Sequence, residues 1–243
     1  MVQHAYLDLV RQTDPTAVSP LVKDRVFYYS LKRLLELSSA AIALVILSPL
    51  FVVIAVLIIL DTGLPIFFTQ NRVGARRLTR GGYSYWQQTT FPCYKFRTMV
   101  QNADDTLHRE FAKTLIKGDN VPDDAYHQFK TNDPRVTQVG TILRKTCLNE
   151  LPQFVNVLKG EMSLVGPRPI LHYELADYQN WHKKRLACLP GITGLWQVRG
   201  HCGQSFDYMI RQDIEYIRNQ SLQLDFKILF LTIPTVLSIR GAG

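Results

Sequence analysis

Cysteine is scarce in this sequence, and its spacing excludes several classes of protein. The four cysteines among 243 residues form no Cys-x-x-Cys pair, and the six histidines show no metal-ligand spacing. A chain of this length with scattered thiols is not a small disulfide scaffold. The N-terminus lacks the charged and then apolar pattern of a signal peptide. We therefore expect reduced cytoplasmic thiols, without a zinc site or a disulfide framework.

Acidic residues are outnumbered by basic ones. The chain has 28 Lys and Arg against 20 Asp and Glu, which gives a formal net charge of +8. Such a surplus predicts an anionic partner: nucleic acid, an acidic lipid surface or phosphorylated substrates. The sequence has no zinc-finger, helix-turn-helix or RNP pattern, and its basic residues fall in stretches typical of phosphate sites. We therefore expect no nucleic-acid partner.

Charge is missing altogether from residues 37–60. A helix of this length reaches roughly 36 Å, enough to cross the hydrocarbon core, so membrane insertion is predicted. Pro49 lies at the midpoint and should kink the helix. The segment is then either a spanning helix with a tolerated proline or a re-entrant hairpin that returns to the same face. Basic residues flank both ends, so the positive-inside rule does not decide between them.

The rest of the chain gives coarser signals. Residues 61–100 mix β-branched and aromatic residues with turn signals such as Gly81-Gly82, and residues 101–132 are polar, helical or irregular. Residues 228–239 are mostly apolar but too short to span a membrane and contain Pro234. Packing in the core is the default prediction for this segment, and an interfacial position is the alternative.

Residues 148–160 have the pattern of a helix. Apolar residues recur at i, i+3, i+4 and i+7 from Leu151. Asn149 is a plausible N-cap, Pro152 falls in the first turn, and Gly160 is a plausible stop. This pattern predicts that Asn149 and Glu150 lie at a helix N-terminus, where unpaired N–H groups and the dipole favour a phosphate.

Basic residues cluster around this segment. Arg168 lies between two prolines at 166–169, which stiffens the backbone and limits where its guanidinium can point. Arginine suits phosphate because its planar fork makes paired, charge-assisted hydrogen bonds. These residues predict phosphate chemistry at a membrane; the cluster consists of Lys95, Arg97, Arg135, Arg144, Lys145 and Arg168.

Several motifs follow one another in a fixed order from Lys32 to the C-terminus. They are Lys32-Arg33, Ser48-Pro49, and residues 65–74, 95–99, 133–137, 148–153, 156–169 and 190–198. In this order they resemble the monotopic phosphoglycosyl transferases, the bacterial sugar transferases that begin exopolysaccharide, O-antigen and glycoprotein glycan assembly. The resemblance is to the short form of the family, a catalytic core with a membrane hairpin.

The resemblance implies an organisation and a reaction. The organisation is an N-terminal lead-in (1–30), a re-entrant membrane hairpin (31–61) broken at Ser48 and Pro49, and a cytoplasmic catalytic domain (62–243). The domain would be an α/β core with interfacial amphipathic helices, lying on lipid at the cytoplasmic face of the bacterial inner membrane. The reaction moves hexose-1-phosphate from a UDP-hexose to undecaprenyl phosphate, depends on Mg²⁺ and releases UMP. The resemblance favours glucose or galactose as the sugar and leaves a homo-oligomer open.

The resemblance also implies roles for individual residues. In the family, the aspartate of an Asp-Glu pair attacks the β-phosphate of the UDP-sugar, and this chain has Asn149 and Glu150 there. Glu150 would hold Mg²⁺, and Asp213 matches a family acidic position near the metal. The diphosphate and the polyprenyl phosphate would be bound by basic residues, namely Lys95, Arg97, Arg135, Arg144 and Arg168.

Asn149 is the important departure from the family pattern. A neutral amide oxygen is a poor nucleophile, because the amide nitrogen lone pair is delocalised, yet asparagine caps a helix as well as aspartate does. Three explanations stay open. The residue belongs to an engineered trapping variant, to a natural enzyme that uses another nucleophile or direct transfer, or to a catalytically silent homologue that serves as a membrane scaffold.

Overall fold

The computed structural model describes residues 14–118, 133–199 and 205–237. Its strands are β1 (Val22–Lys23), β2 (Phe67–Arg80), β3 (Tyr83–Phe96), β4 (Ser163–Val165) and β5 (Gly191–Thr193). Its α-helices are α2 (Val26–Thr62), α3 (Thr106–Lys117), α5 (Gln138–Lys145), α6 (Gln153–Lys159), α7 (His172–Ala176), α8 (Leu195–Arg199), α9 (Phe206–Arg218) and α10 (Leu222–Leu237). Two 3-10 turns are η1 (Leu148–Glu150) and η2 (His182–Leu186). This mixture of helix and sheet confirms the predicted fold class at the coarse level.

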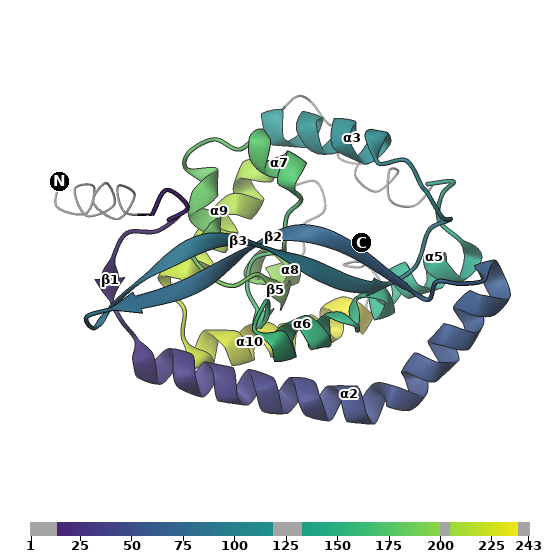
Figure 1. Cartoon of the computed structure of the whole chain (residues 1–243), viewed down its shortest axis with the longest axis horizontal. Coiled ribbons are helices and arrows are strands. Elements are labelled where there is room, and N and C mark those ends of the chain that lie inside the picture. The colour runs from purple at the N-terminus through teal and green to yellow at the C-terminus, as the bar shows by residue number, and fades with distance from the viewer. Residues whose placement is uncertain (1–13, 119–132, 200–204, 238–243) are drawn as a thin grey trace.

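Strands β2 and β3 form a long antiparallel hairpin that crosses the molecule (Figure 1). Its register runs from Phe67 opposite Phe96 to Arg80 opposite Tyr83. Gly81 and Gly82 join the strands with φ of 57° and 78°, values that favour glycine and suit a two-residue hairpin turn. The turn expected at these two glycines is therefore confirmed.

Helix α2 contains the long apolar run and continues through Pro49. It is the helix of the described chain that is long and apolar enough to cross a membrane. Figure 1 shows that it runs along one edge of the molecule and bends partway, as expected for a helix with an internal proline. The Ser48 hydroxyl donates to the Val45 carbonyl oxygen at 2.8 Å. The helix begins at Val26, inside the region predicted as a lead-in.

Both halves of α2 pack against the same body of the protein. Before Pro49, Ala40 is buried in a cluster with Phe91 and Met162. Beyond Pro49, Ile54 and Ile58 are buried in a second cluster, with Phe96 and Leu143. Between these two contacts the apolar side chains are largely exposed, namely Ile42, Val45, Ile46, Val52 and Val53.

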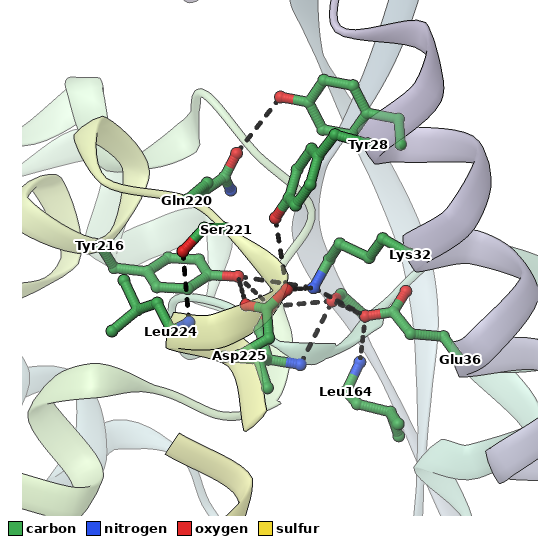
Figure 2. Close-up of polar contacts among 12 residues, drawn as sticks. Tyr28, Lys32, Glu36, Leu164, Tyr216, Gln220, Ser221, Leu224 and Asp225 are labelled. Atoms are coloured by element: carbon green, nitrogen blue, oxygen red, sulfur yellow. Dashed lines mark hydrogen bonds and ion pairs between the residues drawn. The ribbon is translucent and has the colours of Figure 1, made fainter. Parts of the chain in front are cut away.

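A buried polar network fixes the first half of α2 (Figure 2). The Lys32 ammonium lies 2.9 Å from Glu36 Oε1 and 2.8 Å from Asp225 Oδ2 of α10. Tyr216 of α9 donates to Asp225 Oδ1 at 2.7 Å and to a backbone carbonyl of β4. Glu36 in turn accepts hydrogen bonds from the Ser163 hydroxyl and from the backbone N–H of the next residue, both in β4. The network therefore links α2 to α9, α10 and the strand that leads into the Arg168 loop.

We expect Lys32→Met to destabilise the protein by about 3–5 kcal/mol, because it leaves two buried carboxylates without their cation. The exposed pair of Arg199 and Glu215, 2.9 Å apart, is the matched control. Arg199→Met should cost less than about 1 kcal/mol. Free energies of unfolding from denaturant titration in one detergent provide the comparison. Equal losses for the two variants would show that the buried network contributes no more than a surface pair.

The segment from 148 to 160 differs in part from its prediction. Asn149 is not the N-cap of a helix but the middle residue of the 3-10 turn η1, and α6 begins only at Gln153. The physical reason is the backbone of Cys147, whose φ of 56° turns the chain sharply after α5. Pro152 then precedes the first residue of α6, where its missing N–H costs no helical hydrogen bond. The predicted stop at Gly160 is confirmed, with φ of 79° at the C-cap.

Helix α10 is packed on one side only. Ile228 is fully buried, whereas Phe226, Phe230 and Ile233 are exposed. The default prediction of core packing therefore holds for one face of the helix and fails for the other. Residues 238 and 239 of the predicted segment lie outside the described residues.

Candidate active site

Glu150 is at the centre of the predicted phosphate site. Its Oε1 lies 2.8 Å from the Lys95 ammonium and 3.9 Å from Arg168 Nη1. Both cations approach Oε1. The other carboxylate oxygen, Oε2, forms no ion pair with the described residues. Residues distant in the sequence, from β3, η1 and the loop after β4, are thus brought together as the sequence predicted.

The cations keep Glu150 ionised. Burial alone would raise the pKa of its carboxyl, but the nearby Lys95 and Arg168, with a hydrogen bond from Lys95, lower it to about 2. A carboxylate that stays charged at neutral pH is a suitable ligand for a hard cation such as Mg²⁺.

The loop that carries Arg168 is held between two strands. Strands β4 and β5 pair in parallel, and Gly191 N–H donates to the Pro167 carbonyl oxygen at 2.8 Å. A Cβ at Gly191 would lie 2.1 Å from the backbone nitrogen of Gly166, so this close approach requires glycine. On the other side, Val73 of β2 donates to the Ile170 carbonyl oxygen at 2.9 Å. Backbone contacts therefore fix Arg168 beside Glu150.

Asp213 lies behind this loop. Its carboxylate is buried and ion-paired with Arg185 at 2.6 Å. Arg185 also donates to the backbone carbonyl oxygen of Arg168 at 3.2 Å and to the Tyr178 hydroxyl at 2.7 Å. Burial raises the pKa of the Asp213 carboxyl to about 6 against the opposite effect of Arg185. In this structure Asp213 supports the Arg168 loop through Arg185, and its role as a metal ligand stays a prediction.

The other predicted cations lie in different surroundings. Arg97 is buried and donates to the Thr62 hydroxyl at 2.7 Å, at the end of α2. Arg135 is paired with Asp133 at 2.7 Å, and Arg144 Nε donates to the Thr98 hydroxyl at 3.0 Å. The structure therefore brings together Lys95, Glu150 and Arg168, whereas the partners of Arg97, Arg135 and Arg144 among the described residues are other groups.

Three pocket residues had no role in the sequence prediction. Arg72, Gln153 and Gln197 line the same small pocket as Lys95, Glu150 and Arg168. Arg72 lies in one of the ordered motifs, but nothing in its spacing relates it to Glu150. The only available signal was a basic residue within one of the ordered motifs, which does not distinguish a ligand from a surface charge.

Asn149 directly precedes Glu150 in η1 and is half-buried. The turn that positions it follows the left-handed Cys147, an uncommon conformation for a residue with a side chain. Because side chains of asparagine and aspartate have the same shape, this backbone can present either one at position 149.

The residues fit a magnesium ion that arrives with a phosphorylated substrate. The described residues contain no group of three or more His, Cys, Asp or Glu side chains that could hold a metal alone. Mg²⁺ commonly uses one or two carboxylates and completes its shell with waters and substrate phosphates. One ionised carboxylate with a free oxygen, as in Glu150, satisfies that requirement.

Comparison with known proteins identifies the family. The family model for bacterial sugar transferases matches residues 27–239. The chain is 39% identical over 216 residues to the exopolysaccharide production protein ExoY of Rhizobium meliloti, covering 87% of each chain. It is 41% identical over 214 residues to the undecaprenyl-phosphate galactose phosphotransferase of Salmonella typhimurium, covering 87% of this chain and 41% of that one. It is 35% identical over 226 residues to the undecaprenyl-phosphate glucose phosphotransferase of Komagataeibacter xylinus, covering 87% and 36%.

The chain therefore belongs to the bacterial sugar transferase family, as its ordered motifs predicted.

Proposed function

We propose that this chain transfers hexose-1-phosphate from a UDP-hexose to undecaprenyl phosphate, releases UMP and so initiates assembly of a polysaccharide. The names of its relatives support this reaction, since they include undecaprenyl-phosphate galactose and glucose phosphotransferases. The observation that carries the proposal is the ionised Glu150 held between Lys95 and Arg168 in one pocket. Cations around a single carboxylate suit a metal-bound diphosphate.

Each residue of this group has a separate task in the proposed reaction. Lys95 and Arg168 neutralise phosphate oxygens of the donor as negative charge grows on the departing UMP. Glu150 would hold Mg²⁺, which supplies further neutralisation of the diphosphate when bound. Arg185 and Asp213 keep the backbone of Arg168 in place, so that its guanidinium needs little rearrangement.

The residue at 149 decides how the phosphorus is attacked. In the family mechanism, a carboxylate at this position bonds to the β-phosphorus while the bond from that phosphorus to the bridging oxygen breaks. UMP leaves with the bonding electrons, and the polyprenyl phosphate then displaces the carboxylate. With Asn149 this first step lacks its nucleophile. Asn149 is also the observation that favours the second candidate function, a silent homologue that acts as a membrane scaffold.

Transfer is tested by incubating the chain in nanodiscs with Mg²⁺, undecaprenyl phosphate and a panel of UDP-glucose, UDP-galactose and UDP-N-acetylhexosamines. Formation of the lipid-linked hexose phosphate together with UMP supports the proposal and identifies the sugar. A folded chain that forms neither product, both as it stands and with Asn149→Asp, favours the scaffold.

We further propose that α2 is re-entrant at the inner membrane, so that both of its ends and the catalytic domain lie on the cytoplasmic face. The packing of both halves of α2 on one body supports this topology, because a spanning helix would separate its two ends. The exposed Phe226, Phe230 and Ile233 of α10 would lie in the lipid interface beside it.

This topology predicts that single cysteines at the two ends of α2 share one side of the membrane. Phe27 and Leu64 are both exposed, so Phe27→Cys and Leu64→Cys can be introduced after the native cysteines are replaced. Neither should react with an impermeant maleimide in intact spheroplasts, and both should react in inverted vesicles. Labelling of one end only in spheroplasts would indicate a spanning helix instead.

A further inference from the structure

Arg72 is a half-buried cation for which the proposed reaction has so far no task. It projects from β2 and lines the pocket that contains Lys95, Glu150 and Arg168. Its Nη2 donates to Gln70 Oε1 at 2.9 Å and its Nη1 donates to the Pro169 carbonyl oxygen at 3.2 Å. Its Nε is buried and has no hydrogen-bond partner among the described residues.

Arg72 differs from the other cations of this pocket in its lack of a carboxylate partner among the described residues. Lys95 and Arg168 share a single oxygen of Glu150, whereas Arg72 forms no ion pair with any described residue. Burial and repulsion from Arg168 lower the pKa of the Arg72 guanidinium, with smaller opposite effects from Glu174 and Glu150. A partly desolvated charge without a counter-ion is unfavourable, so an anionic ligand at this position would be stabilising.

We infer that Arg72 is a further phosphate-binding residue of this pocket and takes an oxygen of the β-phosphate of the donor, an inference that rests on the proposed function. The two neutral acceptors, Gln70 and Pro169, hold the plane of the guanidinium without neutralising its charge, and the buried Nε–H has no acceptor among the described residues. Arginine suits this task because its charge persists in a buried site and its fork matches phosphate oxygens. The contact to Pro169 places Arg72 against the residue that follows Arg168, so the two arginines approach the ligand together.

The inference is tested by measuring UDP binding to the purified chain in nanodiscs by calorimetry, with Mg²⁺ present. Arg72→Gln should weaken UDP binding by roughly 10-fold to 100-fold, the usual loss when a charge-assisted hydrogen bond is removed. The UDP affinity of Arg72→Lys should lie between those of the unsubstituted chain and Arg72→Gln, because lysine keeps the charge but lacks the forked guanidinium. Arg76→Gln is the matched control: Arg76 lies on the same strand with an exposed side chain, and its removal should change binding less than twofold.

UMP provides a second measurement that a merely structural role would not change. If Arg72 binds the diphosphate, Arg72→Gln should reduce the preference of the chain for UDP over UMP, whereas general loosening of the pocket would weaken both equally. An equal loss for both nucleotides overturns the inference. So does a variant that binds UDP within twofold of the unsubstituted chain.

A third arm distinguishes the donor from the lipid acceptor. In this arm, binding of the chain and of Arg72→Gln to vesicles with and without undecaprenyl phosphate is compared. If Arg72→Gln binds UDP normally but binds less well only to the vesicles that contain undecaprenyl phosphate, Arg72 belongs to the acceptor site and the donor assignment is overturned. If the unsubstituted chain binds no UDP at all, while circular dichroism shows it to be folded, the proposed function itself fails. That result differs from failure of the inference, in which the unsubstituted chain binds and Arg72→Gln has no effect.

Discussion

Asn149→Asp is expected to raise UMP release from a UDP-hexose by a factor on the order of 10³ or more, because it restores a nucleophilic carboxylate. The change removes no contact on which the turn η1 depends, since that turn is fixed by its backbone and by the left-handed Cys147. Position 149 is half-buried and directly precedes Glu150. Asparagine and aspartate side chains have the same shape, so the variant should fold.

The measurement is the initial rate of UMP release in nanodiscs with Mg²⁺ and undecaprenyl phosphate. Asn219→Asp makes the same change at an exposed residue after α9 and should leave the rate unaltered. If the unsubstituted chain is already as active as Asn149→Asp, the carboxylate-nucleophile mechanism does not apply. Attack by Glu150 or directly by the polyprenyl phosphate would then be the alternative.

The sequence predicts the existence and the bend of α2, but not how the helix packs on the rest of the protein. The uncharged run of residues 37–60 is longer than a buried helix requires, so it predicts a membrane segment. Pro49 predicts the bend of that segment. Basic residues flank both ends, so charge assigned no side. The additional information comes from tertiary packing, in which Ala40 and Ile58, on either side of the proline, contact one body. The pattern of residues within one helix does not reveal contacts of this kind with other parts of the chain.

The candidate site was predictable only in part for a similar reason. Lys95 and Arg97 belong to one motif, but β3 ends at Phe96. Lys95 therefore still follows the strand toward Glu150, whereas Arg97 turns to the end of α2 and donates to Thr62. Arg72, by contrast, lines the pocket although its local sequence does not indicate a ligand. It is placed there by the pairing of β2 with the loop after Arg168, a contact between segments distant in the sequence.

Glu150→Gln is expected to change two measurements in opposite directions. In the Asn149→Asp background, turnover should fall by a factor on the order of 10³ or more, because the ligand for Mg²⁺ is lost. Binding of UDP without Mg²⁺ should become a few-fold tighter. The substitution removes the anion that two cations of this pocket share, so Lys95 and Arg168 become available to phosphate. Misfolding would weaken both, so only a local role gives this combination.

The dependence on pH gives the same prediction a further check. Since the pKa of Glu150 is about 2 when the pocket is formed, its carboxylate stays ionised throughout the range from about pH 5 to 8. The ratio of UDP affinities between Glu150→Gln and its parent should therefore remain constant over that range. Glu161→Gln is the control, because Glu161 accepts from the Asn156 amide, a contact that glutamine retains. A ratio that disappears as the pH falls from 7 to 5 would mean that Glu150 is protonated there, and that Lys95 and Arg168 do not hold it as a charged ligand.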